Sequence, residues 1–566
     1  MFKFSLPASI LAALLLLPLA GNAGQKLVDV PVATAAGKTW SGQTPADCPF
    51  QKSDNITGIS FTGRHAEYTG ADTWYPSWAS DGKMYSPWTD GTVNGLSSGS
   101  GGKDATTGYA TIIGDDPLHL VVTNQAVYKS DPSPYASRYP CGSLVYNGVW
   151  YYGTYCLHPA GSVKHEGISY NWPWLGPFVG FRYSTDFGKT WTQTPCTPAK
   201  PLFGEQALKG EPVKIGSPHF VDFGKNMEHS PDGKAYFVAH GASDGVNRRY
   251  GYNSWITGDE IYLARVTPSI ENINDASKYE FFDGTGWTKD FSKIKPIAAW
   301  RDHMGCVTMT YNAPLKKFLL CVTDGGNTTG KYHTYILESD KITGPFKMAQ
   351  YLHHFGEQGY FVNIPSKFIS ADGKTMWLCY SANYCTVWKG DKLLSSPPGS
   401  KYAMCLQEFK PLNPNTPAPT PSVLEADDNV ARLATVTGSS VHPDYAVTGA
   451  SDGVVDGFPG DISHEWATNG ERETAMLRLS WKDEQTIDRV WLFDRPNTNA
   501  DQITAGMLIF SDGSTLPVGP LPDDAKQGVE VSFPAKKVKW LIFAVNAVKP
   551  GSLNIGLSEI AVFRSK

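Results

Sequence analysis

One pattern recurs five times before residue 410: an apolar strand, a tight polar turn and a second strand rich in aromatic residues. The copies lie at 75–91, 142–156, 219–241, 307–325 and 364–383. A further strand-like segment follows most of them, as in "GDEIYLARV" at 258–266. Repeats of three or four antiparallel strands are typical of β-propellers, because radial packing leaves only short exposed sheet edges. The pattern predicts an all-β fold with a five-bladed propeller.

Composition supports this fold class. Aromatic residues make up 12% of the chain, which also has 56 glycines and 40 prolines. Aromatic side chains suit pleated surfaces, whereas Gly and Pro interrupt them at turns. The segment "STDFGKTW", 184–191, resembles the Asp-box of sialidases and other propellers, where the Asp caps a hairpin turn and the Trp packs between blades. We therefore expect a structural role for this segment.

The N-terminus indicates export. Lys3 precedes an apolar stretch, and the small residues at 21–23 offer a cleavage site, so residues 1–23 are predicted to be a secretory signal peptide. No other segment is apolar for long enough to predict a membrane span. The net charge of -5 gives no reason to expect a nucleic acid partner. We expect a secreted monomer, extracellular or periplasmic.

A Pro-rich stretch divides the chain. Residues 410–424 lack an apolar period and are predicted to form a semi-rigid linker. Residues 24–409 are then the propeller, and 425–566 are predicted to form a separate β-sandwich.

The cysteines leave the question of disulfides open. Nine are present, so at least one thiol is unpaired. Cys141 and Cys156 flank one predicted turn, and Cys306 and Cys321 flank another, so each pair is placed across a hairpin. Free buried thiols are the alternative, because most cross-strand neighbours have poor disulfide geometry.

The first repeat carries two aspartates that we expect to meet. Its turn is centred on Asp81 and Gly82, and residues equidistant from a hairpin turn lie opposite one another. Asp72 and Asp90 are nearly symmetric about this turn. Both are therefore predicted to emerge at the end of the blade away from Asp81, where they serve either catalysis or loop capping.

The same symmetry predicts that Asp302 lies opposite Asp324 in the fourth repeat, where capping is the favoured interpretation. Segments entering the other inner strands bring further polar and aromatic residues toward the same face. The candidate substrate-binding residues of the propeller are Trp74, Tyr75, Arg138, His219, Arg301, Asp302, His303, Asp324 and Asn363.

Paired carboxylates are the working groups of glycoside hydrolysis: one protonates the leaving oxygen, and the other activates water or attacks the anomeric carbon. The cations Arg138, Lys214, Arg301 and His303 suggest a rival chemistry. Next to Tyr139 they could neutralise a uronate and remove its α-proton, as a polysaccharide lyase does.

The first repeat resembles the first blade of the propeller family that includes bacterial endo-D-arabinanases. Its pattern "D-T-x-Y-x-x-x-x-x-D-G-K-x-Y-x-x-W-x-D" runs from Asp72 to Asp90. The chain is more remotely similar to arabinanase and fructosidase propellers. The resemblance implies that Asp72 and Asp90 carry catalysis; it covers residues 55–405 as architecture and this one blade as motif.

Residues 427–566 resemble the discoidin, or coagulation-factor type C, modules, which are similar to galactose-binding-like carbohydrate modules. The phrase "ASDGVVDG" at 450–457 and the final "SEI" match the part of that family that binds a structural calcium ion. This resemblance implies Asp452, Asp456 and Glu559 as ligands; a Gly-rich turn whose acids never meet is the alternative.

Two further residues of this module are candidates for sugar contact. Asp494 and Arg495 stand at a predicted strand end, where they bind sugar hydroxyls or form an ion pair that holds the loop.

The leading hypothesis is a secreted glycoside hydrolase that cleaves a polysaccharide through Asp72 and Asp90, with the C-terminal module keeping it on its polymer. A polysaccharide lyase and a non-catalytic carbohydrate-binding or adhesion protein remain as alternatives.

Overall fold

A computed structural model describes most of the chain. The described residues are 25–29, 38–40, 44–158, 163–165, 168–170, 174–242, 253–325, 332–384, 397–415, 423–426, 428–458, 462–497, 500–523, 525 and 527–565. The predicted signal peptide lies outside them, as does residues 416–422 of the predicted linker. The chain divides into two compact units: one spans 35–419, and the other combines 420–566 with the N-terminal 34 residues.

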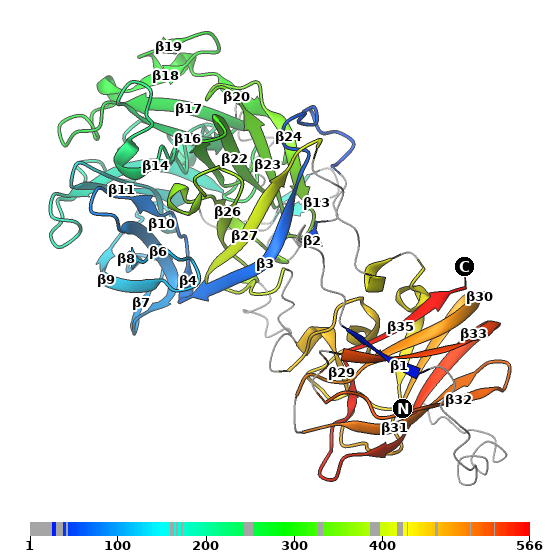
Figure 1. Cartoon of the computed structure of the whole chain (residues 1–566). Helices are drawn as coiled ribbons and strands as arrows, with labels where there is room; N and C mark the ends of the chain where they lie inside the picture. Colours follow the sequence, from blue (N-terminus) through cyan, green and yellow to red (C-terminus); the bar gives the residue numbers. More distant parts are fainter. Residues whose placement is uncertain are drawn as a thin grey trace. The chain divides into compact units, whose positions relative to one another are not determined.

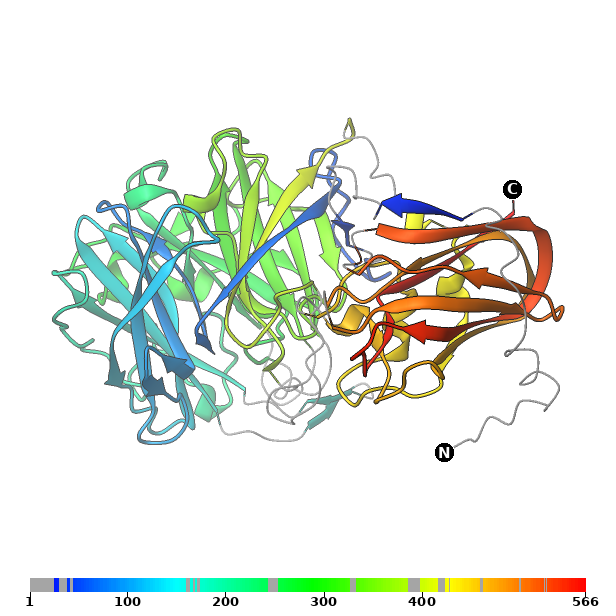
Figure 2. The same cartoon turned by 60° about the horizontal axis from the view of Figure 1, so that its bottom comes forward.

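The larger unit is the predicted five-bladed β-propeller (Figures 1 and 2). Blade 1 consists of β4 (Gly70–Asp72), β6 (Met84–Val93), β8 (Thr106–Ile113) and β9 (Val121–Lys129), with β5 (Ser77–Trp78) and β7 (Leu96–Ser98) paired to β6. Blade 2 consists of β10 (Ser137–Tyr146), β11 (Val149–Leu157) and β14 (Leu175–Ser184). A small hairpin of β12 (Val163–His165) and β13 (Ile168–Tyr170) lies between β11 and β14 in sequence.

Blade 3 consists of β15 (His219–Phe220), β16 (Ala235–Gly241), β17 (Glu260–Val266), β18 (Glu280–Phe282) and β19 (Trp287–Thr288), with β20 (Pro296–Ala299) on β17. Blade 4 consists of β21 (Val307–Asn312), β22 (Lys317–Asp324), β23 (His333–Ser339) and β24 (Lys347–Leu352). Each of the five predicted hairpins falls in a blade of its own.

Blade 5 closes the ring with strands from both ends of the propeller sequence. β25 (Tyr360–Asn363), β26 (Met376–Ser381) and β27 (Met404–Leu412) are joined by β3 (Gly58–Tyr68) and β2 (Lys38–Thr39). In Figure 1 the blue β3 runs beside the yellow β27, with which it pairs antiparallel. Sequence analysis missed this closure, because a lone strand carries no hairpin signal.

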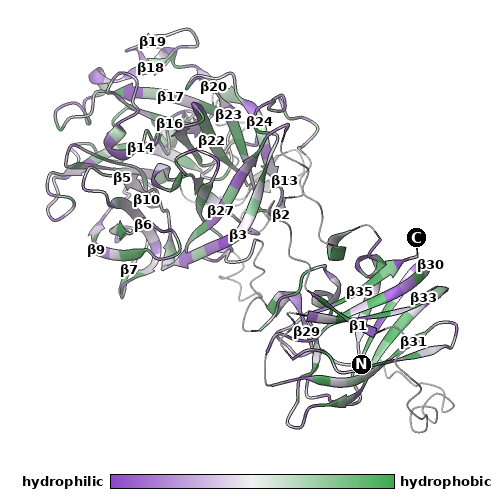
Figure 3. Cartoon of the chain, in the orientation of Figure 1, coloured by the Kyte–Doolittle hydropathy of each residue, from purple (hydrophilic) through white to green (hydrophobic). Residues whose placement is uncertain are grey.

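Burial follows the position of a strand in its blade. β11 and β22 lie between neighbouring strands and blades and are buried almost throughout, whereas the second half of β3 is partly exposed. Figure 3 shows the same contrast in hydropathy between β22 and β3. The Asp-box has its expected structural role: Asp186 accepts hydrogen bonds from the Thr190 amide at 2.9 Å and the Ser184 hydroxyl at 2.7 Å, and Trp191 packs on Trp150.

The smaller unit is a β-sandwich. Its main sheet has the order β28 (Thr435–Gly438), β30 (Met476–Phe493), β33 (Gln527–Val548), β31 (Ile503–Phe510) and β32 (Thr515–Val518), with β35 (Glu559–Arg564) on β30. A second ladder pairs β29 (Trp466–Ala467) with β34 (Gly556–Leu557). Register shifts interrupt the long β30 and β33, and such irregularities let strands bend around a core.

The N-terminal strand β1 (Gln25–Asp29) belongs to this sandwich, where it pairs antiparallel with β33. Val28 faces inward and packs with Phe493 and Phe563, while Leu27 on the opposite face is 60% exposed. The sequence interpretation had counted residues 24–34 with the propeller; a five-residue segment gives no sign that its pairing partner lies some 500 residues away.

The eight cysteines of the described residues are all free. Of the two possibilities left open by the sequence, the structure has the second: Cys141, Cys156, Cys306 and Cys321 are buried free thiols. Cys141 lies in a register shift of its hairpin, and Cys156 faces Arg138 instead.

The helices within the described residues are short 3₁₀ turns, and none of them is long and apolar enough to span a bilayer.

Candidate functional site

Asp72 and Asp90 meet at one end of blade 1. Asp72 ends β4 and pairs with Thr89 of β6, so Asp90 follows its direct partner. The register shifts between Gly70 and Asp72, and the two aspartates are close enough for the charge of Asp90 to act on Asp72. Asp81 stands at the turn on the other end of the hairpin, where it accepts hydrogen bonds from the Lys83 amide and the Tyr85 hydroxyl.

Asp72 is held by three hydroxyl groups. Its Oδ1 accepts a hydrogen bond from Thr73 at 2.7 Å. Its Oδ2 accepts from Tyr360 at 2.9 Å and lies 3.1 Å from the hydroxyl of Tyr402. Both tyrosines come from blade 5, so the site is built where the first and last blades meet. The Asp72 side chain is only 4% exposed.

Asp90 is held from within its own blade. Its Oδ1 accepts from the Ser100 amide and its Oδ2 from the Ser100 hydroxyl, each at 2.7 Å. Its backbone oxygen accepts from Tyr402 at 2.6 Å. The Asp90 φ of 47° is in the left-handed region, which costs energy for a residue with a side chain. The blade therefore holds Asp90 in one strained orientation.

Electrostatics separates the two carboxyl groups. Burial, followed by the charge of Asp90, raises the pKa of Asp72 well above its ordinary value, against the hydrogen bonds from its three hydroxyl partners. Burial also raises the pKa of Asp90, and the two hydrogen bonds from Ser100 oppose that shift. Two carboxylates that share a site cannot both ionise easily. Asp72 is the more deeply buried of the two, and its pKa is raised more strongly than that of Asp90.

A wall of tyrosines surrounds the pair. Burial and then the charge of Asp90 raise the pKa of Tyr139, which also interacts with Ser100. The ring of Tyr384 lies 6.2 Å from that of Tyr402 and 6.3 Å from that of Tyr360. Tyr139, Tyr360, Tyr384 and Tyr402 come from blades 2 and 5 and supply phenol groups and ring faces to one place. Tyr360 is fully buried and holds Asp72 from inside the fold, whereas the other three tyrosines are only partly buried.

Four of the expected substrate-binding residues are buried inside the propeller. Trp74 is 1% exposed and donates to the Ala71 carbonyl, so it is a core residue that presents no face to a sugar, which corrects its expected role. Tyr75, His219 and Asn363 are also buried, and they line a small cavity of about 40 Å³ between inner strands. They support the site from below and do not line an open funnel.

The expected pairing of Asp302 with Asp324 is replaced by a histidine contact. His303 Nδ1 lies 2.7 Å from Asp324 Oδ2, which also accepts from Tyr351. The pKa of His303 is raised above its ordinary value: burial lowers it, but the hydrogen bond and charge of Asp324 raise it. β21 begins only at Val307, so Asp302 precedes the regular hairpin and the symmetry argument does not reach it. Asp302 has a φ of 64° and lies 3.6 Å from Arg301.

The proposed basic cluster is dispersed. Arg138 belongs to blade 2, where it donates to Thr154 and to the Asp131 carbonyl. Lys214 lies over the ring of Tyr262 in blade 3. Arg301 and His303 follow β20, and each has an acidic neighbour. Among the described residues, these cations are thus tied to separate partners.

In the sandwich, Arg495 forms an ion-pair network. It contacts Glu465 at 2.8 Å and Asp501 at 3.2 Å, and it is 4% exposed. Asp494 is fully buried and accepts from the amides of Arg495 and Ile503. Both residues hold the loop, in agreement with the second of the two interpretations offered for them.

Arg495 nevertheless borders a hollow that sequence analysis did not find. Its volume is about 450 Å³, and its rim includes Phe458, whose side chain is 55% exposed. The lining also includes Tyr445, Asn497, Asp501 and Asn554. An exposed ring beside amide and carboxylate groups is suited to a ligand with one apolar face and several hydroxyls.

The expected calcium ligands divide into two groups. Glu559 is fully buried; its Oε2 accepts from the Gly453 amide, and its Oε1 has no hydrogen-bond partner among the described residues. The pKa of Glu559 is raised well above its ordinary value, mainly by burial. The hydrogen bond from the Gly453 amide lowers this pKa, and the charge of Asp452 raises it. An orphaned oxygen beside a second carboxylate fits a hard cation. Asp456 accepts from the adjacent Gly457 amide, and Asp452 also pairs with His464.

The residues that sequence analysis missed come from distant strands. Tyr360 and Tyr402 lie 288 and 330 residues from Asp72, and no local pattern marks either of them. The Ser100 contact with Asp90 is closer in sequence and lies within the Gly/Ser-rich stretch 97–102, whose composition does not single out one serine.

Comparison with known families reaches the sandwich alone. Residues 429–563 match a family described as a domain of unknown function, DUF7402. No curated protein matches the chain.

Three of the solved structures similar to the chain each align with about a quarter of it. The lectin domain of lectinolysin complexed with Lewis B antigen is 23% identical, covers 25% of this chain and 99% of its own, and has a TM-score of 0.20. A family 32 carbohydrate-binding module from C. perfringens NanJ in complex with galactose is 14% identical over 24% of this chain and 98% of its own, with a TM-score of 0.21. A protein named SpGH29 is 16% identical over 24% of this chain and 28% of its own, with a TM-score of 0.19.

Proposed function

We propose that the chain is a secreted glycoside hydrolase that cleaves a polysaccharide at the junction of blades 1 and 5. The observation that carries the proposal is the buried Asp72 with Asp90 beside it, both held by hydroxyl groups. Export rests on the signal-like N-terminus. The resemblance of blade 1 to endo-D-arabinanases makes arabinan the first substrate to test.

Asp72 acts as the general acid in this proposal. Its raised pKa keeps a proton on the carboxyl, and that proton moves to the glycosidic oxygen as the bond from this oxygen to the anomeric carbon breaks. Asp90 acts as a carboxylate, either by attacking the anomeric carbon or by taking a proton from the attacking water. The first route retains the anomeric configuration and the second inverts it.

The sandwich holds the enzyme on its polymer. A sugar ring would stack on Phe458 while its hydroxyls bind Asn497, Asn554 and the edge of Arg495. Binding there raises the local concentration of polymer near the propeller. Calcium would be bound by Glu559 and Asp452, where it neutralises two neighbouring carboxylates and fixes the loop after Gly453.

Asp72→Asn and Asp90→Asn test the hydrolase, with Asp81→Asn as the matched control in the same hairpin. Arabinans, galactans and uronate-containing glycans are incubated with each chain, and reducing ends are measured together with ultraviolet absorbance. We expect new reducing ends from the wild type and the control and a loss of about 10³-fold or more in the two variants. Equal activity in all four chains would refute the assignment.

The alternatives give different readouts in the same assay. Products that absorb in the ultraviolet would indicate a lyase, because elimination leaves a double bond in the sugar. A wild type that binds a glycan without cleaving any would indicate an adhesion protein. Phe458→Ala distinguishes the role of the sandwich from that of the propeller. We expect this variant to bind insoluble polymer more weakly and to cleave short oligosaccharides as the wild type does.

A further inference from the structure

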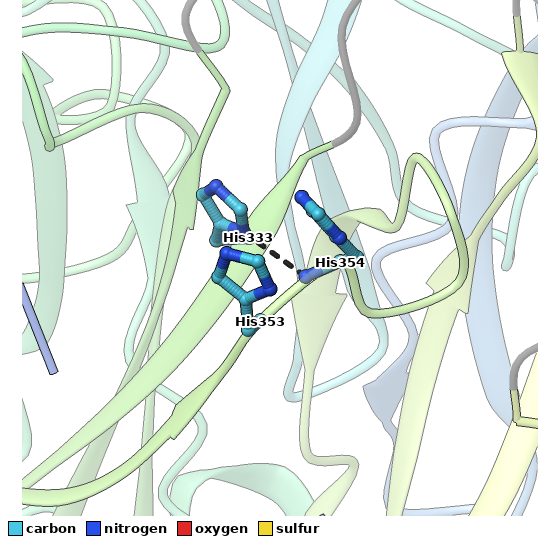
Figure 4. A group of neighbouring side chains, drawn as sticks. All are labelled: His333, His353 and His354. Carbon is cyan, nitrogen blue, oxygen red and sulfur yellow. Dashed lines mark hydrogen bonds between the residues drawn. The ribbon is translucent and has the colours of Figure 1, made fainter. Parts of the chain in front are cut away.

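Three histidines converge at one end of blade 4. His333 begins β23, and His353 and His354 directly follow β24 (Figure 4). One ring nitrogen of each histidine lies within 4.8 Å of a ring nitrogen of each of the other two. The antiparallel register explains why these histidines meet. Thr334 pairs with Leu352, so His333, one residue earlier, lies opposite the segment that follows Leu352.

We propose that this histidine triad binds one divalent transition-metal ion of the Zn²⁺ and Cu²⁺ class. Imidazole nitrogen is a preferred ligand for these ions, whereas Ca²⁺ and Mg²⁺ prefer oxygen. Three protein ligands leave a further position for water, and His353 is exposed, so an ion can enter from solvent. Nothing in this proposal depends on the glycosidase assignment.

The three histidine rings are already packed together. The rings of His353 and His354 are 3.8 Å apart, and that of His333 lies 4.4 and 4.9 Å from them. Asp324 pairs directly with His333 across the ladder of β22 and β23, and an acidic residue beside the triad favours a positive ion nearby.

One hydrogen bond competes with the metal. His333 Nδ1 accepts from the His354 amide at 3.0 Å, the dashed line in Figure 4. A metal bound through Nδ1 takes over this lone pair. The loss of this one hydrogen bond costs less than three metal–imidazole bonds contribute. Binding through Nδ1 would therefore displace the backbone amide of His354, whose φ of 56° lies in the left-handed region.

A bound ion would fasten the connection between blades 4 and 5. Trp40 donates to the His353 carbonyl at 2.9 Å, which ties the same corner to the N-terminal segment of the propeller. The chain then runs through a tight turn with positive φ at Gly356 and Glu357 into β25. An ion at the triad therefore stabilises the start of the segment that leads to blade 5.

The test uses the full chain without a histidine tag, stripped of metal and titrated with Zn²⁺ by calorimetry. His353→Ala removes the exposed ligand, and His119→Ala is the control because its side chain is 80% exposed elsewhere on the propeller. We expect one Zn²⁺ per wild-type and control chain, and an affinity lower by about tenfold or more in His353→Ala. Circular dichroism checks that each variant is folded.

Two further measurements identify the ligands. Co²⁺ bound to the wild type is expected to give visible absorption bands that His353→Ala loses, and excess Ca²⁺ should not displace Zn²⁺. Zinc binding that is unaffected by His353→Ala, displacement by Ca²⁺, or the absence of any zinc binding to the folded wild type would overturn the proposal.

Discussion

The hydroxyl of Tyr402 shares its single proton between Oδ2 of Asp72, 3.1 Å away, and the backbone oxygen of Asp90, 2.6 Å away. One phenol from blade 5 therefore fixes the spacing between the two acidic residues of blade 1. Because this hydrogen bond favours the ionised form of Asp72, it also moderates the rise in pKa caused by burial. Tyr402 is a positioning residue for the proposed acid.

Tyr402→Phe is expected to lower activity and to shift its pH dependence. Loss of the hydrogen bond raises the pKa of Asp72 further, so the acid stays protonated to higher pH and the alkaline limb of kcat/KM moves upward. A bond worth about 0.5–1.5 kcal/mol corresponds to a shift of roughly 0.4–1 pH unit. Tyr128→Phe, on the outer strand β9, should leave the profile unchanged. A downward shift in Tyr402→Phe would contradict the role given to Asp72.

Asp72→Asn is expected to raise the stability of the propeller at neutral pH. A carboxyl group whose pKa is raised on folding destabilises the folded state progressively as pH rises above the unfolded value. Removing the charge should therefore increase the melting temperature at pH 7–8 and have no effect near pH 4. The expected gain is about 1–3 kcal/mol, because hydrogen bonds already compensate part of the burial.

Asp186→Asn provides the opposite sign in the same melting experiment. Hydrogen bonds from Thr190 and Ser184 lower the pKa of Asp186 to about 2, so its ionised form stabilises the folded state at neutral pH. This variant should melt earlier than the wild type at pH 7. If Asp72→Asn also melts earlier, Asp72 is a structural anchor and its catalytic role is in doubt.

How far the sequence predicts the site depends on how local each contact is. The hairpin of blade 1 contains both Asp72 and Asp90, so turn symmetry was enough to bring them together. The same symmetry fails for Asp302, because residues 300–306 are not part of the regular ladder of blade 4. Tyr360 and Tyr402 reach Asp72 through closure of the ring, which sequence spacing does not reveal.

The fold shows the same division. Five hairpins were predicted because each is a local repeat with its own turn. The strands that join distant segments, β3 on β27 and β1 on β33, were not predicted. Isolated strands of this kind have no periodic partner in sequence, and their pairing is decided by which sheet edge is left uncovered.

The strand β1 provides a test of that edge. Val28→Asp places a charge against Phe493 and Phe563, whereas Leu27→Asp changes the adjacent exposed side chain of the same strand. We expect Val28→Asp to destabilise the sandwich by about 2–3 kcal/mol and Leu27→Asp to have little effect. In the thermal melting curve of each variant, the transition of the propeller should be unchanged. Equal effects of the two substitutions would mean that β1 does not pair with β33 in solution.

Calcium removal tests the carboxylates of the sandwich. Glu559 Oε1 is buried without a partner among the described residues, and Asp452 adds a second negative charge, so a bound cation should stabilise this unit. Addition of Ca²⁺ at 100 times its Kd is expected to contribute about 2.7 kcal/mol, and chelation with EGTA should reverse the effect. Mg²⁺ should stabilise this unit less than Ca²⁺, because it loses its water ligands reluctantly.

Glu559→Gln should abolish the stabilisation by Ca²⁺, whereas Asp444→Asn, a change at an exposed acid of the same unit, should retain it. Glu559→Gln also removes an uncompensated buried charge, so in EGTA this variant is expected to be at least as stable as the wild type. If Glu559→Gln is less stable than the wild type in EGTA, Glu559 stabilises the fold through its hydrogen bond from the Gly453 amide and not through calcium.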